Sequence, residues 1–319
     1  MPESTREEHC IGIIGAGSIG VAWAVVFTTA GYRVRLYDLD RHRVDRAREE
    51  FTDRIAELKK FGLVTTDIDC ALDLLSTETD IKKNISEVIH IQECIPEIKE
   101  EKKKLFSLLS GLVPESVPIA SSTSFLPIST FATEIKNPER CLVIHPGNPP
   151  YLLRVAEIVP GPLTSPSIVD ASVDLMRHAG MHPIVLKKET NGFVFNRLQG
   201  ALLNEAYSLV EDGVASVEDI DTIVKDGLGL RWSIVGPFET VDLNTRGGIR
   251  KHAERMGPTY QQIGAERGTS TSWMPALIDL VESERRSKLP LNMWEERVRW
   301  RDRAMMVISV ARRNFLEDN

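Results

Sequence analysis

Three polar side chains in the middle of the chain have the types needed to oxidise an alcohol. His145 ends the apolar run 141–144 and enters a loop rich in proline and glycine, Glu157 follows, and Asn196 interrupts an apolar helical pattern. Removing a hydroxyl proton as hydride leaves carbon requires a base, and a neutral imidazole suits this near neutral pH. We therefore interpret His145 as a base, Glu157 as the carboxylate that orients it, and Asn196 as an amide that holds a substrate.

Each of these assignments has a structural alternative. Glu157 is flanked by the apolar residues of 155–159, so it could equally be an outward-facing residue of an edge strand, since charged residues are usually exposed. Asn196 could make a hydrogen bond within the helical part of the protein. The hydroxyls of the segment 121–124, which follows another apolar strand, could bind a substrate oxygen, as we expect for Ser124, or cap a helix before Pro127.

The other histidines are weaker candidates. Four lie in polar or charged stretches and are interpreted as surface or internally hydrogen-bonded residues: His9, His42, His90 and His252. His178 and His182 have a spacing found in metal ligands, but Gly180 separates them and no carboxylate accompanies them. We expect no metal site.

A glycine-rich turn near the start predicts a dinucleotide site. Gly15-Ala16-Gly17-Ser18-Ile19-Gly20 lies between the apolar strand 10–14 and the helix 18–30, the context that the motif requires. Gly15 permits the tight turn, Gly17 lets the backbone approach a pyrophosphate, and Gly20 lets helix and strand pack closely. The phosphates would lie at the helix N-terminus, where free N–H groups favour anions.

Asp38 closes the second predicted strand, 33–37, where an acid would accept hydrogen bonds from the adenosine ribose. A carboxylate there repels a 2′-phosphate, so the sequence predicts NAD rather than NADP. Arg41 and Arg43, close by, are the residues that would favour NADP instead.

The alternation of strands and helices predicts an α/β fold. Further strands are expected at 88–91, 117–120, 141–144 and 184–186, with helical patterns between most of them, which indicates a doubly wound, mostly parallel Rossmann sheet. After residue 190 strand signals nearly vanish, and Ser216 has the character of a helix cap. We predict a Rossmann domain over residues 1–190 and an all-α domain over residues 191–319.

Composition limits the classes of partner. The formal net charge is −7, and an acidic protein repels nucleic acid and anionic lipid, so neither is an expected partner. The run Lys102-Lys103-Lys104 is interpreted as one solvated helix face. No apolar stretch reaches the roughly 18 residues of a membrane span. The four scattered cysteines predict reduced thiols, and together these features predict a cytoplasmic protein.

With these residues assembled, the chain resembles the 3-hydroxyacyl-CoA dehydrogenase superfamily, and within it the lambda-crystallin / L-gulonate 3-dehydrogenase branch. The resemblance covers nearly the whole chain. Its motifs are 15–20, 91–97, 121–124, 145–150, 192–197, 227–232, 236–240 and 300–302. The acyl-CoA enzymes differ from this chain at the histidine loop and lack Arg231-Trp232. Gly147 and the segment 152–154 depart from the gulonate branch.

The resemblance implies residue roles. It places Ser124, His145, Glu157 and Asn196 on the four active-site positions of the superfamily, and Glu97 and Lys102, with 15–20 and Asp38, on its NAD-contacting positions. It also implies a Rossmann domain followed by a helical domain that forms a homodimer.

We therefore predict an NAD-dependent dehydrogenase that oxidises the 3-hydroxyl of a small 3-hydroxy acid, with L-gulonate as the expected substrate and 3-dehydro-L-gulonate as the product. Asn148 and Arg231 are predicted to contact the substrate, and Arg231 is predicted to bind the substrate's carboxylate. The alternative for Arg231 is a structural pairing with Glu239 or Asp242. The alternative functions are a 3-hydroxyacyl-CoA or 3-hydroxybutyrate dehydrogenase and a lambda-crystallin-like structural protein. A lysine-dependent 3-hydroxy acid dehydrogenase is excluded because its Lys-x-x-Asn helix is missing.

Overall fold

The computed structural model describes residues 9–60 and 63–266 and, beyond them, separate positions between 275 and 311. Contacts between residues divide the chain into two compact units, Met1–Leu202 and Leu203–Asn319. The division falls inside helix α7 (Phe195–Glu211), beyond residue 190, because the first turns of α7 still contact the first unit. Arg301 and Asp302, which belong to the last of the motifs noted above, lie outside the described residues.

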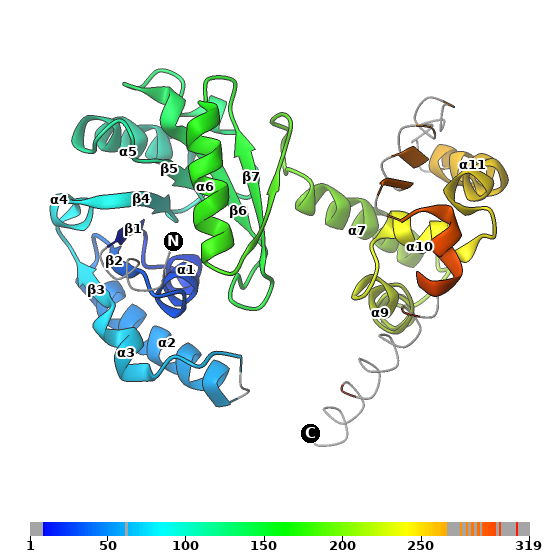
Figure 1. Ribbon diagram of the computed structural model, residues 1–319, viewed down its shortest axis with the longest axis horizontal. Helices are drawn as coiled ribbons and strands as arrows, with labels where there is room; N and C mark the ends of the chain where they lie inside the picture. Colours follow the sequence, from blue (N-terminus) through cyan, green and yellow to red (C-terminus); the bar gives the residue numbers. More distant parts are fainter. Residues whose placement is uncertain are drawn as a thin grey trace. The chain divides into compact units, whose positions relative to one another are not determined.

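The first unit is built on one eight-stranded sheet (Figure 1), with the strand order β3-β2-β1-β4-β5-β6-β7-β8. The strands are β1 (Cys10–Ile14), β2 (Arg33–Tyr37), β3 (Leu75–Glu78), β4 (Val88–Glu93), β5 (Ile119–Ser121), β6 (Cys141–Pro146), β7 (Val155–Pro160) and β8 (His182–Val185). Neighbouring strands are parallel except β6 and β7, which are antiparallel. The predicted doubly wound, mostly parallel sheet is confirmed.

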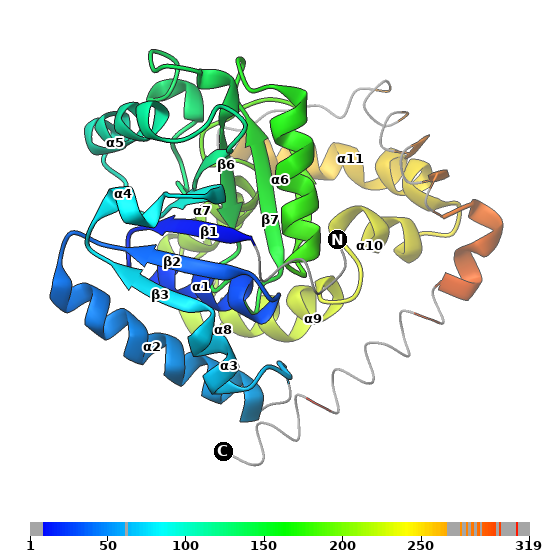
Figure 2. The same ribbon diagram turned by 60° about the vertical axis from the view of Figure 1, so that its left-hand side comes forward.

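Helices cover both faces of this sheet (Figure 2). The helices of the first unit are α1 (Ser18–Thr29), α2 (Arg41–Lys60), α3 (Ile68–Asp73), α4 (Ile81–Asn84), α5 (Lys99–Leu112) and α6 (Pro166–His178), with short 3-10 turns η2 (Ile128–Thr130) and η3 (Pro138–Arg140). Burial on both faces explains why the central strand β1 is continuously apolar.

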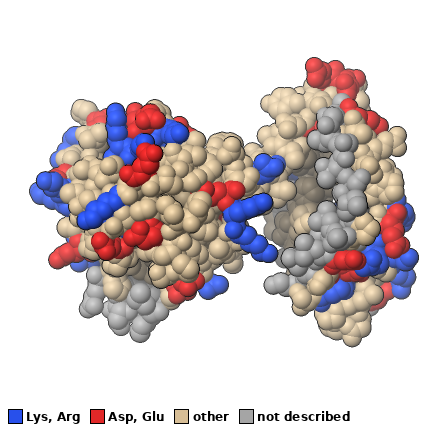
Figure 3. All heavy atoms as spheres, turned by 90° about the horizontal axis from the view of Figure 1, so that it is seen from above, with Lys and Arg blue, Asp and Glu red and all other residues tan. Residues whose placement is uncertain are grey.

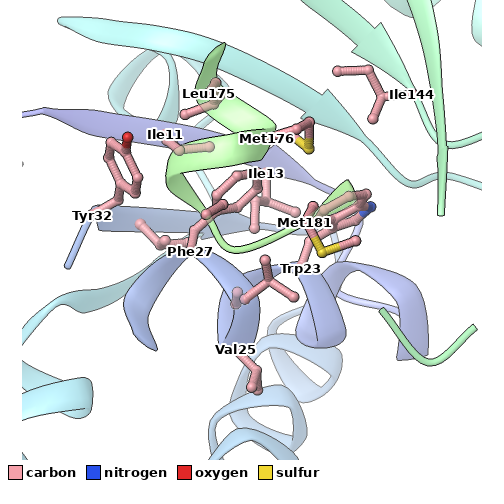
Figure 4. Close-up of a cluster of buried hydrophobic side chains, with 14 of the residues drawn as sticks. Ile11, Ile13, Trp23, Val25, Phe27, Tyr32, Ile144, Leu175, Met176 and Met181 are labelled. Atoms are coloured by element: carbon pink, nitrogen blue, oxygen red, sulfur yellow. The ribbon is translucent and has the colours of Figure 1, made fainter. Parts of the chain in front are cut away.

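The core is divided by the sheet into two clusters. On one face, side chains of α1, α2 and α6 pack against β1 and β6. Figure 4 shows Trp23 and Phe27 of α1 with Met176 of α6 and Ile144 of β6 in this cluster. The opposite face holds α5, whose buried Phe106 stacks edge-on with Phe131. Residues of β6 therefore alternate between the two clusters, and His145 lies on the α5 face with Val143.

Two strand expectations differ from the structure. The edge strand β3 was not expected because its sequence, Leu-Ser-Thr-Glu, is short and mostly polar. The alternative placement of Glu157 on an edge strand is wrong, because β7 pairs with β6 on one side and β8 on the other. The Glu157 side chain is buried, so the exposed alternative fails as well.

The described residues of the second unit form helices and irregular segments, without a strand. Beyond α7 these helices are α8 (Val217–Thr222), the π-helix η4 (Ile223–Leu228), α9 (Gly229–Trp232), α10 (Pro237–Asn244), α11 (Gly248–Glu266) and the 3-10 turn η5 (Leu291–Met293). The predicted cap at Ser216 is present, with Ser216 and Asp219 forming a reciprocal capping box.

Several surface expectations can be compared with the structure. Lys102 is wrong as part of a solvated face: it is buried on α5, whereas Lys103 is partly exposed and Lys104 exposed. On the face of the first unit seen in Figure 3, basic and acidic side chains are intermixed. Among the described residues, no helix is long and apolar enough to cross a membrane, and no cluster of potential metal ligands occurs. The four cysteines are free thiols.

Candidate active site

The glycine turn between β1 and α1 has the geometry that a dinucleotide requires. Gly15 has φ +104°, and a Cβ there would lie 2.7 Å from the Cys94 carbonyl oxygen, so only glycine fits. A Cβ at Gly20 would lie 1.9 Å from the Gly15 oxygen. Because glycine has no Cβ, α1 can pack this close to the turn. Apart from its chain neighbours, no described residue has an atom within 4 Å of a Cβ built on Gly17, which leaves open space at the helix N-terminus where the pyrophosphate is expected.

Asp38 is held in place at the end of β2. One carboxylate oxygen accepts a hydrogen bond from the Ala16 amide at 2.9 Å, and the other accepts one from the Asp40 amide at 3.1 Å. The carboxylate is therefore fixed beside the glycine turn, where an adenosine ribose would lie. Arg43 forms an ion pair of 2.7 Å with Glu50. Because its charge is paired in this way, Arg43 does not offset the repulsion of a 2′-phosphate by Asp38.

A buried ion pair between Lys102 and Glu93 lies at the end of β4. Lys102 Nζ is 2.7 Å from Glu93 Oε1 and 3.8 Å from Glu97 Oε2, and Lys102 and Glu93 are almost fully buried. Glu97 also accepts hydrogen bonds from the Thr123 hydroxyl and from the Phe125 amide. These contacts connect the expected NAD residues Glu97 and Lys102 with the segment that carries Ser124.

His145 and Glu157 form a buried pair. Nδ1 of His145 lies 2.7 Å from Oε2 of Glu157, with both side chains at most 7% exposed. A carboxylate can only accept, so Nδ1 donates and Nε2 carries the lone pair of the neutral base. The rings of Phe193 and Phe195 lie 5.5 and 6.2 Å from the imidazole centroid. An imidazole in this arrangement can take a proton while Glu157 stabilises the resulting cation.

The surroundings of Glu157 keep it ionised. Burial alone would raise the pKa of this carboxyl, but hydrogen bonds from His145 and from the Val194 and Phe195 amides outweigh burial, and the pKa is lowered. The amides donate to Oε1 at 2.8 and 3.0 Å, while Oε2 serves His145. Glu157 is therefore a carboxylate at neutral pH.

Asn196 and Ser124 are also brought together. Nδ2 of Asn196 donates to the Ser124 backbone carbonyl at 2.9 Å, and both side chains are partly exposed. Asn196 directly follows Phe195, whose amide binds Glu157. Hydrogen bonds therefore link all four expected catalytic residues in one region of the first unit.

Two further residues are expected to contact the substrate. Asn148 is exposed in the loop between β6 and β7 and precedes Pro149 through a cis peptide bond. In the same loop, a Cβ at Gly147 would lie 2.8 Å from the Leu153 Cβ. The two departures from the gulonate branch, at Gly147 and in the segment 152–154, are therefore in contact with each other. Arg231 belongs to α9 in the second unit, and its guanidinium has no hydrogen-bond or ion-pair partner within the described part of the chain.

Some site features were missed by sequence reasoning. Arg54 of α2 donates to the carbonyl and hydroxyl oxygens of Ser18 at 2.9 and 3.1 Å, which places a cation at the first turn of α1. Three polar side chains also form a hydrogen-bonded series. Gln92 donates to the Ser122 hydroxyl at 2.7 Å, and its side-chain oxygen lies 3.0 Å from Nε2 of His90. Sequence reasoning missed these contacts because they join residues from different elements. The one signal in the sequence was the presence of single polar residues among apolar neighbours. His90 and His252 are buried, and their rings are hydrogen-bonded to Gln92 and Thr245, so the interpretation as internally hydrogen-bonded residues, rather than surface ones, is confirmed for both.

A Rossmann sheet with this glycine turn and a buried imidazole–carboxylate pair defines a nicotinamide-dependent alcohol dehydrogenase. Family models agree with this class. Residues 10–190 match the 3-hydroxyacyl-CoA dehydrogenase NAD binding domain, and residues 192–290 match the 3-hydroxyacyl-CoA dehydrogenase C-terminal domain. The chain belongs to the 3-hydroxyacyl-CoA dehydrogenase family, and its cofactor is NAD.

Individual relatives narrow the family to the expected branch. Lambda-crystallin of Oryctolagus cuniculus is 34% identical over 307 residues, covering 95% of this chain and 96% of the relative. L-carnitine dehydrogenase of Streptomyces griseus is 34% identical and covers 81% and 76% of the two chains. The structure of 3-hydroxybutyryl-CoA dehydrogenase of Escherichia coli is similar with a TM-score of 0.65 and 30% identity, covering 75% of this chain and 50% of that one. The predicted resemblance to the lambda-crystallin branch is confirmed.

Proposed function

We propose that this protein oxidises the 3-hydroxyl of a small, free 3-hydroxy acid with NAD, and that its substrate is L-gulonate, which yields 3-dehydro-L-gulonate. The observation that carries the proposal is the buried contact of 2.7 Å between His145 and Glu157 at the carboxyl end of β6, the edge of the sheet at which β1 also leads into the dinucleotide turn. Similarity to L-carnitine dehydrogenase, whose named substrate is a free 3-hydroxy acid, supports the choice of a free acid.

The residues have separate roles in the proposed reaction. Nε2 of His145 removes the hydroxyl proton, and Glu157 holds the imidazole through Nδ1 and stabilises its cation. Ser124 and Asn196 position the hydroxyl, and Asn148, in the loop between β6 and β7, contacts the substrate. NAD, when bound, accepts the hydride. The turn 15–20, Asp38, Glu97 and Lys102 hold the cofactor, Lys102 acting through its ion pair with Glu93.

We propose that Arg231 binds the substrate carboxylate. A guanidinium recognises a carboxylate through two parallel hydrogen bonds, whereas a thioester offers no charge at that position. The structural alternative named Glu239 and Asp242 as partners, and these residues form ion pairs with Arg297 and Arg286. A partly exposed arginine with no partner in the described residues is available for a ligand.

We further propose that residues 191–319 form a domain that contributes to substrate binding and joins two copies into a homodimer. Helix α7 has no buried residue although it carries apolar side chains along its length; Leu198, Leu203, Tyr207 and Val210 are exposed. An apolar helix of this kind is typical of a surface that another subunit covers.

Steady-state kinetics on a panel of acids tests the proposal. NADH formation would be measured with L-gulonate, L-threonate, 3-hydroxybutyrate and 3-hydroxybutyryl-CoA under the same conditions. We expect kcat/KM to be highest for L-gulonate and the CoA ester to be the poorest substrate. A preference for the CoA ester would assign the protein to the acyl-CoA enzymes, and activity with none of the four would contradict the proposed reaction.

A further inference from the structure

The chain makes an unusual turn just before α7. Gly192 has φ +73° and Phe193 has φ +50°, so two consecutive residues adopt the left-handed conformation. Glycine adopts it freely, but a bulky side chain in this region is an outlier that its surroundings must enforce. Phe193 is fully buried, and its amide donates to the Thr190 carbonyl at 3.1 Å. The turn is therefore fixed by the core of the first unit.

This turn directs the next two amides onto one carboxylate oxygen. The amides of Val194 and Phe195 donate to Glu157 Oε1 at 2.8 and 3.0 Å. Consecutive amides can converge on one acceptor where the backbone turns or a helix begins, and concave arrangements of amides bind anions. Both amides lie at the start of α7, where N–H groups lack partners within the helix and the helix dipole favours negative charge.

The two oxygens of Glu157 consequently have different tasks. Oε1 is held by α7, and Oε2 is left to accept from Nδ1 of His145 at 2.7 Å. Fixing one oxygen fixes the plane of the carboxylate, and with it the direction from which the imidazole is held. The ring of Phe193 also contacts His145, so the same residue that makes the turn borders the base.

We propose that the Gly192-Phe193 turn positions the catalytic pair, by aiming the amides of Val194 and Phe195 at Glu157 so that its second oxygen orients His145. The inference rests on the proposed dehydrogenase reaction for its kinetic consequence. Burial raises the pKa of the Glu157 carboxyl, but the hydrogen bonds from His145 and from both amides outweigh burial, and the resulting lowered pKa supports the inference.

Two substitutions at one position test the inference. Phe195→Pro removes the amide hydrogen, and proline is well accepted there because Phe195 is the first residue of α7. Phe195→Ala removes the same ring but keeps the amide, so it is the matched control. Relative to Phe195→Ala, we expect Phe195→Pro to lower kcat with L-gulonate by about 10-fold, as for a lost hydrogen bond to a charged group. In a Glu157→Ala background, the difference between the two variants should vanish.

A spectroscopic readout needs no substrate. The low-field proton resonance of the His145–Glu157 hydrogen bond would be followed by NMR as the pH falls, with its assignment made from its absence in His145→Gln. In Phe195→Pro it should be lost at a higher pH than in Phe195→Ala, because Glu157 is protonated more easily. An unchanged titration in the proline variant would overturn the inference. If the parent protein oxidises none of the acids, the proposed function fails while this comparison still decides the role of the turn.

A second pair of variants covers the case in which the proline variant does not fold. A Cβ at Gly192 would meet only ordinary contacts, the nearest 3.5 Å away, so Gly192→Ala acts through backbone conformation rather than a clash. Asparagine tolerates the left-handed region, so Gly192→Asn is its control. We expect the resonance to be lost at a higher pH in Gly192→Ala than in Gly192→Asn, and identical behaviour would contradict the inference.

Discussion

His145 of β6 and Glu157 of β7 lie directly opposite each other in the antiparallel register of the two strands. Residues in this relationship project from the same face of a sheet, so the pairing of the strands itself brings the imidazole within 2.7 Å of the carboxylate. The loop 147–154 that joins the strands can therefore vary in sequence without separating the base from its partner. In the proposed reaction, substrate preference and proton abstraction would therefore depend on different parts of one hairpin.

Cofactor choice is expected to depend on the charge of Asp38. Asp38→Ser removes the repulsion of a 2′-phosphate, and we expect the ratio of kcat/KM for NADP over NAD to rise by about 10-fold, the effect of roughly 1.4 kcal/mol. Initial rates with each cofactor at saturating acid measure this ratio. Arg41→Ser is a useful control. Equal use of both cofactors by the parent protein would show that Asp38 does not set the preference.

Arg231 is expected to affect substrate affinity alone. Arg231→Met should raise KM for the acid by roughly 10²-fold, as expected for loss of a charged hydrogen-bonded pair. NADH binding by fluorescence titration and the midpoint of thermal unfolding should stay at parental values. Arg255→Met, an exposed arginine on α11, is the control and should leave KM unchanged. A parental KM in Arg231→Met, or a variant that unfolds, would assign Arg231 to the scaffold.

The buried His90 is expected to make stability depend on pH. Burial lowers the pKa of its imidazole from 6.5 to about 4. Between these values the unfolded chain binds the proton and the folded protein does not, so the free energy of unfolding decreases as the pH falls from about 6.5 to about 4. At about 1.4 kcal/mol for each pKa unit, the loss is about 3 kcal/mol.

Urea unfolding at a series of pH values measures this effect. The decrease should be smaller in His90→Leu, even though that variant is less stable overall because Gln92 loses its partner. His42→Gln, at an exposed position, should keep the parental dependence. If His90→Leu shows the same decrease as the parent, other groups account for the acid sensitivity.

The features that depend on residues close together in the sequence were mostly predictable. The glycine turn and Asp38 are neighbours of one strand–helix unit, so their roles follow from a short motif and its flanking elements. His145 and Glu157 could be paired because both interrupt apolar strands at the correct edge of the sheet.

Features that depend on packing or on the backbone were not predictable in this way. Lys102 belongs to a charged run, and only the placement of Glu93 at the end of β4 shows why it is buried. The donors that hold Glu157 are backbone amides, which every residue except proline possesses, so the residue types of Val194 and Phe195 do not indicate them. The positive φ of Phe193 is likewise set by its burial in the core.

The central claim is that His145 is the base, and the His145→Ala variant tests it most directly. With L-gulonate and NAD at saturation, we predict a kcat roughly 10²–10⁴-fold below that of the parent protein, the usual contribution of a general base. NADH affinity, measured by fluorescence titration on the same preparation, should remain parental because the glycine turn and Asp38 are intact. A variant that binds NADH normally and turns over at a near-parental rate would remove His145 from the mechanism.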